Sequence, residues 1–164
     1  MSLSSNNLLT RARHLVGLAS RTEGIHSSLL CFVAARALRE EGHQVHVCSQ
    51  VLFHTDHSAS SGEKITNEVF LCVEDKLVDE MGVYDDAYHL AEDRLDRWRL
   101  KTARVDNYPH LYEIEHESDE IYAGWGVSPE EVDGMLRLLQ AQDCASQLGR
   151  TTPPLRKDGR SKRL

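Results

Sequence analysis

Apolar and polar positions alternate with a helical period along the first part of the chain. Between residues 7 and 20 the apolar side chains recur every three or four positions, which predicts an amphipathic helix capped by Asn6 or Asn7. They are Leu8, Leu9, Ala12, Leu15, Val16 and Ala19. A helix of this type buries one face against the rest of the domain.

A second helix is predicted from about Ser27 or Ser28 to Glu41, through "LLCFVAARALRE". Its apolar face is wide, so we expect it to be the central buried helix. A serine before an apolar run is a typical N-cap, and Gly42 stands where a helix typically ends.

Further on, the apolar period changes to two, which is typical of strands. Residues 43–53 have one clearly apolar face and predict a strand. Residues 65–73 are partly apolar on both faces, which favours a central strand. Glu74 and Asp75 predict a turn, with a return strand over residues 76–79.

The remaining elements alternate between helix and strand. Residues 85–101 predict a helix with acids at its start and bases at its end, which suits the helix dipole. Residues 103–116 predict one or two short strands interrupted by Pro109. Ser128, Pro129 and Glu131 predict the capped start of a last helix.

This order of elements predicts an α+β fold, with N-terminal helices packed on a mainly antiparallel sheet. The length of 164 residues favours a single globular domain, which we assign to residues 1–149. Residues 150–164 contain Pro153, Pro154 and six basic residues, and predict a flexible basic tail. No glycine-rich phosphate loop is present, and we expect no cofactor.

Charge is distributed unevenly between the domain and the tail. Because the whole chain carries −7 and residues 150–164 carry +5, residues 1–149 carry −12. An acidic body disfavours nucleic acid as a ligand, except through the tail. It favours a partner protein with a basic surface.

The four cysteines are widely spaced, which argues against a disulfide framework and for a reducing cytoplasm. No apolar run is long enough for a membrane helix, and the N-terminus lacks the features of a secretory signal. We therefore predict a cytoplasmic protein that does not bind membranes.

The stretches "CFVAARALREEGHQVHV" and "NEVFLCVEDKLVDEMG" together resemble the core of the papain-like and transglutaminase-like cysteine hydrolase superfamily. The resemblance covers about residues 24–86. It implies a buried helix whose first turn carries a nucleophilic cysteine, followed by strands that carry a histidine and then an Asp or Asn. Cys31 is the candidate nucleophile, and Asp79 falls at the third position of the family pattern.

Glu68 departs from that pattern because it occupies the histidine position. A glutamate is a weak base at neutral pH, and its charge raises the pKa of a nearby thiol. His54 or His57, in the polar stretch after the first strand, are alternative bases. Counting back from Gly42 also places the family cysteine position near His26, Ser27 or Ser28.

Metal binding is a further possibility for the same region. The segment "HTDH" carries His54 and His57 close together. Four other donors fall on strand faces that would coincide in a suitable register: His46, Cys48, Glu68 and Cys72. The other interpretation is that these side chains line a partly polar core.

Three hypotheses follow, from different functional classes. The first is a degenerate thiol-hydrolase-like scaffold that binds another protein, in a regulatory or inhibitory role, through an acidic surface. The candidate surface residues are Glu113, Glu115, Glu117 and Trp125. The second is an active cysteine-dependent amide hydrolase or acyl transferase that uses Cys31 and a loop histidine. The third is a metal-binding protein.

Overall fold

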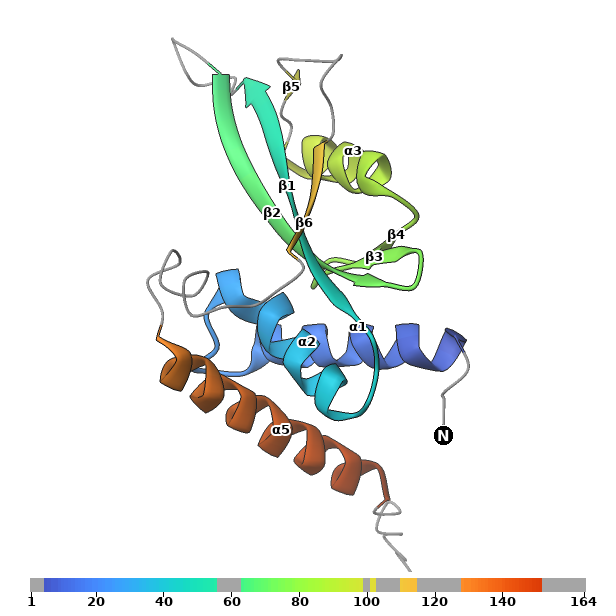
Figure 1. Cartoon of the computed structure of the whole chain (residues 1–164), viewed down its shortest axis with the longest axis vertical. Coiled ribbons are helices and arrows are strands. Elements are labelled where there is room, and N and C mark those ends of the chain that lie inside the picture. Colours follow the sequence, from blue (N-terminus) through green and yellow to red (C-terminus); the bar gives the residue numbers. More distant parts are fainter. Residues whose placement is uncertain (1–4, 56–62, 99–100, 103–109, 115–127, 152–164) are drawn as a thin grey trace, which may run out of the picture.

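The computed structural model describes residues 5–55, 63–98, 101–102, 110–114 and 128–151. Its helices are α1 (Ser5–Arg21), α2 (Leu30–Glu40), α3 (Ala87–Trp98) and α5 (Pro129–Thr151), and a short 3-10 helix, η1 (Ser27–Leu29), precedes α2. Its strands are β1 (His46–Thr55), β2 (Glu63–Val73), β3 (Lys76–Val78), β4 (Val83–Tyr84), β5 (Lys101–Thr102) and β6 (His110–Ile114). Figure 1 shows α1, α2 and α5 grouped at one end of a long β1–β2 hairpin.

The strands form one sheet in the order β4-β3-β2-β1-β5, and β6 also pairs with β1. Every pairing is antiparallel, with Cys48 opposite Phe70 and His46 opposite Cys72 along the β1–β2 ladder. The predicted α+β fold with an antiparallel sheet is therefore confirmed. The predicted central position of residues 65–73 is confirmed too, because β2 pairs with β1 on one side and β3 on the other.

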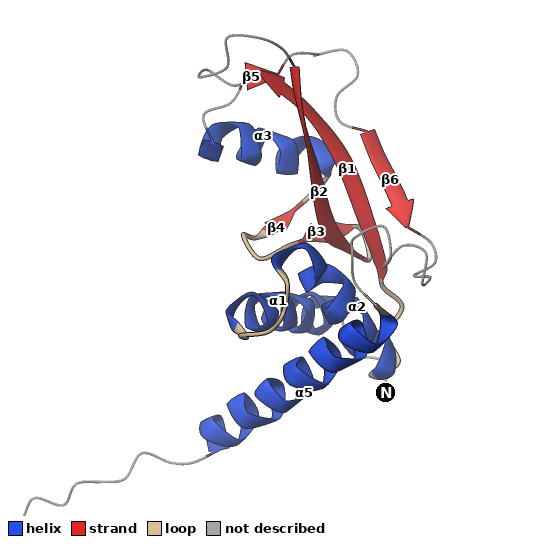
Figure 2. Ribbon diagram, turned by 90° about the vertical axis from the view of Figure 1, so that its left-hand side faces the viewer, coloured by secondary structure: helices blue, strands red, loops and turns tan. Residues whose placement is uncertain are grey.

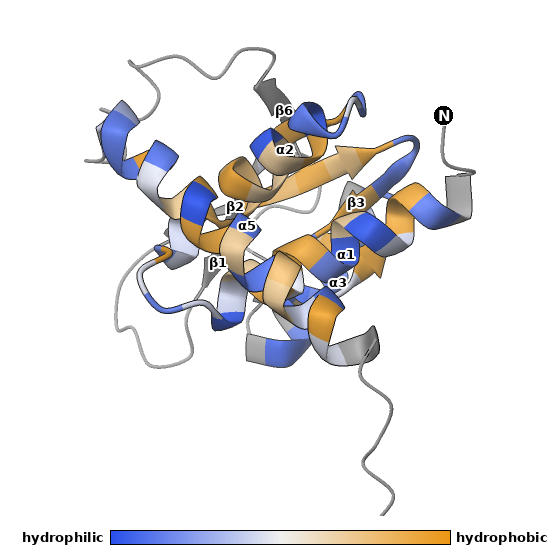
Figure 3. Ribbon diagram, turned by 90° about the horizontal axis from the view of Figure 1, so that it is seen from below, coloured by the Kyte–Doolittle hydropathy of each residue, from blue (hydrophilic) through white to orange (hydrophobic). Residues whose placement is uncertain are grey.

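Strand alternation divides the interior into two cores on opposite faces of the sheet. The larger core joins the buried faces of α1, α2 and α5 to the strand residues Val47, Leu71 and Val78. The smaller core consists of Cys48, Phe70, Leu77 and Leu90, with Cys72 and Tyr84 packed against it. Figure 2 shows α3 beside the strands and away from the other three helices, and Figure 3 shows apolar segments of α2, α5 and the strands turned toward one another.

Local hydrogen bonds mark the end of α2 and the start of α5, two helices of the larger core. After α2, the N–H of Gly42 donates to Arg39 O and the N–H of His43 donates to Leu38 O, at 2.9 and 3.0 Å. Gly42 adopts a φ of +89°, which glycine tolerates without a Cβ clash, so the chain stops in a Schellman motif as predicted.

The start of α5 is the predicted capping box. The Glu131 N–H donates to Ser128 Oγ at 3.2 Å, and the Ser128 N–H donates to Glu131 Oε2 at 2.8 Å. The predicted serine cap of the second helix is wrong. His26 and Leu29 are the N-caps of η1 and α2, and neither makes a side-chain capping bond.

A buried carboxylate ties the three helices of the larger core together. Arg11 of α1 donates to Asp143 of α5 at 2.8 Å and to Glu41, just after α2, at 3.1 Å. His14 Nε2 lies 2.9 Å from Asp143 Oδ1, the oxygen that also accepts the 2.8 Å hydrogen bond from Arg11. The hydrogen bond from Arg11 is the main reason why the pKa of Asp143 is lowered, with His14 adding to it against the effect of burial.

α5 continues to Thr151 and so includes the first two residues of the predicted tail, and residues 152–164 lie outside the described ranges. Among the helices described, none has both the length and the apolar character needed to cross a bilayer. A cytoplasmic location stays a prediction.

Candidate functional site

Cys31 is the second residue of α2 and belongs to the larger core. Its side chain is only 3% exposed, and its Sγ donates to the backbone carbonyl of Val69 on β2 at 3.4 Å. The first turn of a helix favours a thiolate, but burial among apolar side chains favours the neutral thiol. The placement of Cys31 is that of a small core residue that also ties α2 to the sheet.

Asp79 directly follows β3 and organises the turn after that strand. Its Oδ1 accepts the N–H groups of Met81 and Gly82 at 2.8 and 3.0 Å, and its own N–H donates to Gly82 O at 3.1 Å. Its Oδ2 accepts a hydrogen bond from Arg94 of α3. Both oxygens of the carboxylate are therefore engaged by the turn and by a guanidinium.

Arg94 is 1% exposed, and an unpaired charge at such a depth would be strongly unfavourable. Besides Asp79, its Nη1 donates to Asp93 at 2.9 Å and to the Tyr84 hydroxyl at 3.2 Å. Its guanidinium also lies 5.7 Å from the centroid of the Tyr84 ring. These contacts fasten α3 to the end of β3 and to β4.

The same contacts shift the ionisation of the neighbouring groups. Burial, helped by the hydrogen bond to Asp93, raises the pKa of Tyr84. Burial alone would raise the pKa of Asp93, but hydrogen bonds from Arg97 and Tyr84 outweigh it and lower that pKa. The network favours a protonated Tyr84 and an ionised Asp93, which is the combination that holds the hydrogen bond between them.

The candidate catalytic residues fall into separate environments. Cys31 lies in the larger core and contacts Val69 O, whereas Asp79 contacts Arg94 on the α3 side. Glu68 pairs with Gln50 in the β1–β2 ladder, and His54 pairs with Lys64. The side chains of Glu68 and His54 lie outside the described part of the structure, as does all of His57, so their catalytic roles stay predictions.

The described residues include only part of the predicted partner surface. Glu113 belongs to β6, opposite Cys48 of β1. Glu115, Glu117 and Trp125 lie outside the described residues. Their role in binding stays a prediction.

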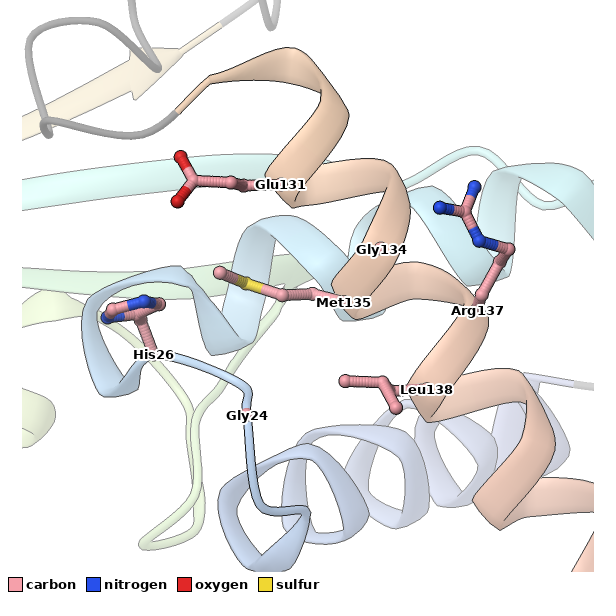
Figure 4. Close-up of a pocket in the computed structure, with 7 residues that line it drawn as sticks. All are labelled: Gly24, His26, Glu131, Gly134, Met135, Arg137 and Leu138. Atoms are coloured by element: carbon pink, nitrogen blue, oxygen red, sulfur yellow. The ribbon is translucent and has the colours of Figure 1, made fainter.

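A cavity of about 520 Å³ opens beside the start of η1, between the segment after α1 and the first half of α5. Its lining combines apolar and charged groups: Gly24, His26, Glu131, Gly134, Met135, Arg137 and Leu138. Figure 4 shows Glu131, Met135 and Leu138 extending from α5 to the side of the 24–26 segment, whereas Arg137 extends from the opposite side of the helix. We call this the α5 pocket.

The backbone of Gly24 is what brings the two walls of the α5 pocket together. It adopts a φ of +90°, and a Cβ added there would lie 3.1 Å from Leu138 Cδ1. The pocket lining includes His26, one of the three positions, with Ser27 and Ser28, to which counting back from Gly42 assigned the family cysteine. The sequence did not indicate that α5 would supply the facing wall.

The strand faces that carry His46, Cys48 and Cys72 do coincide, as the metal hypothesis requires. However, Cys48 and Cys72 are joined in a disulfide, so neither offers a thiolate ligand. The expectation of unpaired cysteines is wrong for this pair, while Cys31 and Cys144 form no disulfide. Within the described ranges no group of three or more His, Cys, Asp or Glu side chains is arranged to hold a metal ion.

Sequence reasoning missed Arg94, although a signal existed. Arg94 follows Leu90 by four residues and Ala91 by three, so it lies on the apolar stripe of α3 and not on its solvent face. A basic residue on a buried stripe requires a buried acid nearby, and Asp79 meets that requirement.

Comparisons of the chain with models of protein families, with curated proteins and with solved structures find no match. The resemblance to thiol hydrolases therefore stays a prediction, and function has to be inferred from the residues of this chain.

Proposed function

We propose that this protein is a binding module built on a thiol-hydrolase-like scaffold, and that it captures a basic segment of another protein through an acidic surface that includes the α5 pocket. The burial of Cys31 is the observation that carries the proposal. Its thiol faces a backbone carbonyl in the core. An amide hydrolase needs its nucleophile exposed to substrate and next to a base.

The α5 pocket lies near the start of α2, the helix that carries Cys31, and offers what a binding module needs. Leu138 is 44% exposed beside buried Met135, which provides an apolar site for one side chain of a partner. Glu130 and Glu131 form an exposed acidic first turn of α5 at one end of it. The charge of −12 on residues 1–149 extends the preference for a basic partner.

The binding half of the proposal can be tested with synthetic peptides that carry one leucine among lysines and arginines, measured by fluorescence anisotropy. Leu138→Asp is expected to weaken binding at least about tenfold, because it places a charge in the apolar site. Leu148→Asp is the matched control, because Leu148 lies on the same helix, is 70% exposed and lies outside the pocket lining. Equal effects of the two substitutions would remove the α5 pocket from the proposal.

The acidic character can be tested separately with Glu130→Lys and with charge reversal at Glu113, Glu115 and Glu117. Each is expected to weaken binding of the basic peptides and to reduce its dependence on salt. Glu92→Lys on α3 is the control for a general change in net charge. Peptide binding that is unaffected by all of these reversals would contradict an acidic binding surface.

The proposal that Cys31 is a core residue and not a catalytic nucleophile is tested by the reactivity of its thiol. Iodoacetamide near pH 7 is expected to modify exposed Cys144 faster than buried Cys31 by a factor of about ten or more. Rapid modification of Cys31, with loss of an amide-cleaving activity in Cys31→Ser, would favour the thiol-enzyme hypothesis instead.

A further inference from the structure

The disulfide between Cys48 and Cys72 runs from the smaller core to its edge, because Cys48 is buried in that core and Cys72 packs against it. It joins β1 to β2, with Cα atoms 6.4 Å apart, and both cysteines pack with Phe70, Leu77 and Leu90. Leu90 is the residue of α3 in this core. The disulfide is therefore part of the surface on which α3 rests.

The two cysteine residues differ in their exposure to solvent. Cys48 is 2% exposed and enclosed by the smaller core. Cys72 is partly exposed and lines a cavity of about 700 Å³ together with His46, His43 and Glu74. A thiol reagent that enters this cavity meets Cys72, and His46 lies directly opposite Cys72 in the strand register.

We propose that the Cys48–Cys72 bond is a reversible redox site that small thiols open through Cys72, and that its state controls how firmly α3 is held on the sheet. Attack on a disulfide depends on access to the sulfur, which selects Cys72. Opening the bond separates two of the side chains that support Leu90. It leaves the larger core untouched, because neither cysteine belongs to it.

The reaction is a pair of thiol–disulfide exchanges. A glutathione thiolate bonds to Cys72 Sγ while the Cys48–Cys72 bond breaks, and Cys48 leaves as a thiolate that takes a proton from water. A second glutathione thiolate attacks the sulfur of the bound glutathione, which releases glutathione disulfide and the Cys72 thiolate. Two glutathione molecules are oxidised and the protein disulfide is reduced; glutathione disulfide reverses both steps.

Loosening of α3 would also affect the turn that contains Asp79, the third position of the family pattern. α3 holds Asp79 through Arg94, so loosening α3 weakens the support of the turn at residues 79–82. The redox state of the hairpin is thus coupled to the position of Asp79 through one helix. This inference does not depend on the proposed binding function.

The choice of sulfur is tested with a matched pair of variants, Cys48→Ser and Cys72→Ser, each in a Cys144→Ser background that removes the exposed thiol. Both are treated with glutathione disulfide, quenched in acid and analysed by peptide mass spectrometry. Glutathione is expected to add to Cys72 at least about tenfold faster than to Cys48. Equal rates, faster addition to Cys48, or no addition to either would overturn the proposal.

A second measurement keeps the test valid if either variant fails to fold. The Cys144→Ser protein with its disulfide intact is incubated with glutathione, and its amide hydrogen exchange is compared before and after reduction. Exchange in α3 is expected to rise about tenfold or more while exchange in α2 stays constant. Unchanged exchange in α3, or an equal rise in both helices, would overturn the link between the disulfide and α3.

Discussion

The two faces of the sheet are stabilised by different means. On one face, three helices bury an extended set of aliphatic side chains, and Phe32 is fully enclosed among them. On the other face, α3 rests on a smaller apolar cluster that includes the β1–β2 disulfide, and the buried ion pair of Asp79 with Arg94 fastens it. The disulfide joins the two strands and not α3, which is held by side-chain contacts with them.

This difference matters for function because the two kinds of contact respond to different conditions. Apolar burial is insensitive to redox state and nearly insensitive to pH. A disulfide responds to redox state, and an ion pair responds to pH. Within the described structure, the response to redox state is therefore expected on the α3 face, whereas ion pairs make both faces respond to pH.

The largest effect is expected from truncation in the larger core. Phe32→Ala should lower the free energy of unfolding by about 4 kcal/mol, because it removes an enclosed aromatic ring and leaves a cavity. Leu90→Ala, in the smaller core, should cost about 2 to 3 kcal/mol and act mainly on α3. Urea unfolding followed by circular dichroism measures both, and a greater cost for Leu90→Ala would reverse the ranking of the two cores.

The next effect concerns the buried ion pair. Asp79→Asn keeps an oxygen for the Met81 and Gly82 N–H groups but removes the charge that balances Arg94. It should therefore cost about 3 kcal/mol. The double substitution Asp79→Asn with Arg94→Met removes both charges and should recover at least about half of that loss. Strictly additive losses in this double-mutant cycle would show that the two residues do not stabilise the fold as a pair.

A smaller effect should appear when acid is added. The pKa of Asp143 is lowered in the folded state from an ordinary value of 3.8, so the unfolded chain takes up a proton first. The stabilising contribution of Asp143 is fully present above its unfolded pKa and is lost as the pH falls through its folded pKa. Wild type should exceed Asp143→Asn in unfolding free energy at pH 7, and the difference should shrink below about pH 4. A difference that stays constant down to pH 2.5 would contradict the assignment.

The smallest effect should come from the capping box of α5. Ser128→Ala removes the acceptor for the Glu131 N–H and should cost about 1 kcal/mol. Because α5 belongs to the larger core, the loss should appear in the global unfolding transition and leave hydrogen exchange in α3 unchanged. A selective change in α3 would mean that the two faces are coupled more tightly than their contacts indicate.

Local features were predictable from the sequence because they depend on neighbouring residues. The capping box at Ser128, the stop at Gly42 and the alternation of β1 and β2 each follow from a few adjacent positions. The serine cap of the second helix failed because the chain enters α2 through the 3-10 turn η1, which places Ser27 and Ser28 inside that turn.

Features that depend on register or on distant helices were not predictable. The connection between β1 and β2 is too long to fix their register, so the sequence did not place Cys48 beside Cys72. The pairing of Asp79 with Arg94 required the docking position of α3. The wall of the α5 pocket required contact between segments more than 100 residues apart, which periodicity does not report.

The contact of Arg11 with Asp143 spans 132 residues and has a consequence for how the chain acquires its fold. α5 contributes buried residues to the larger core, so that core cannot close while the C-terminal third of the chain is still being synthesised. The β1–β2–β3 hairpins and α1–α2 emerge from the ribosome first and must wait with apolar surface uncovered. Contacts between residues so distant in sequence form slowly, so this apolar surface stays uncovered until α5 packs on it.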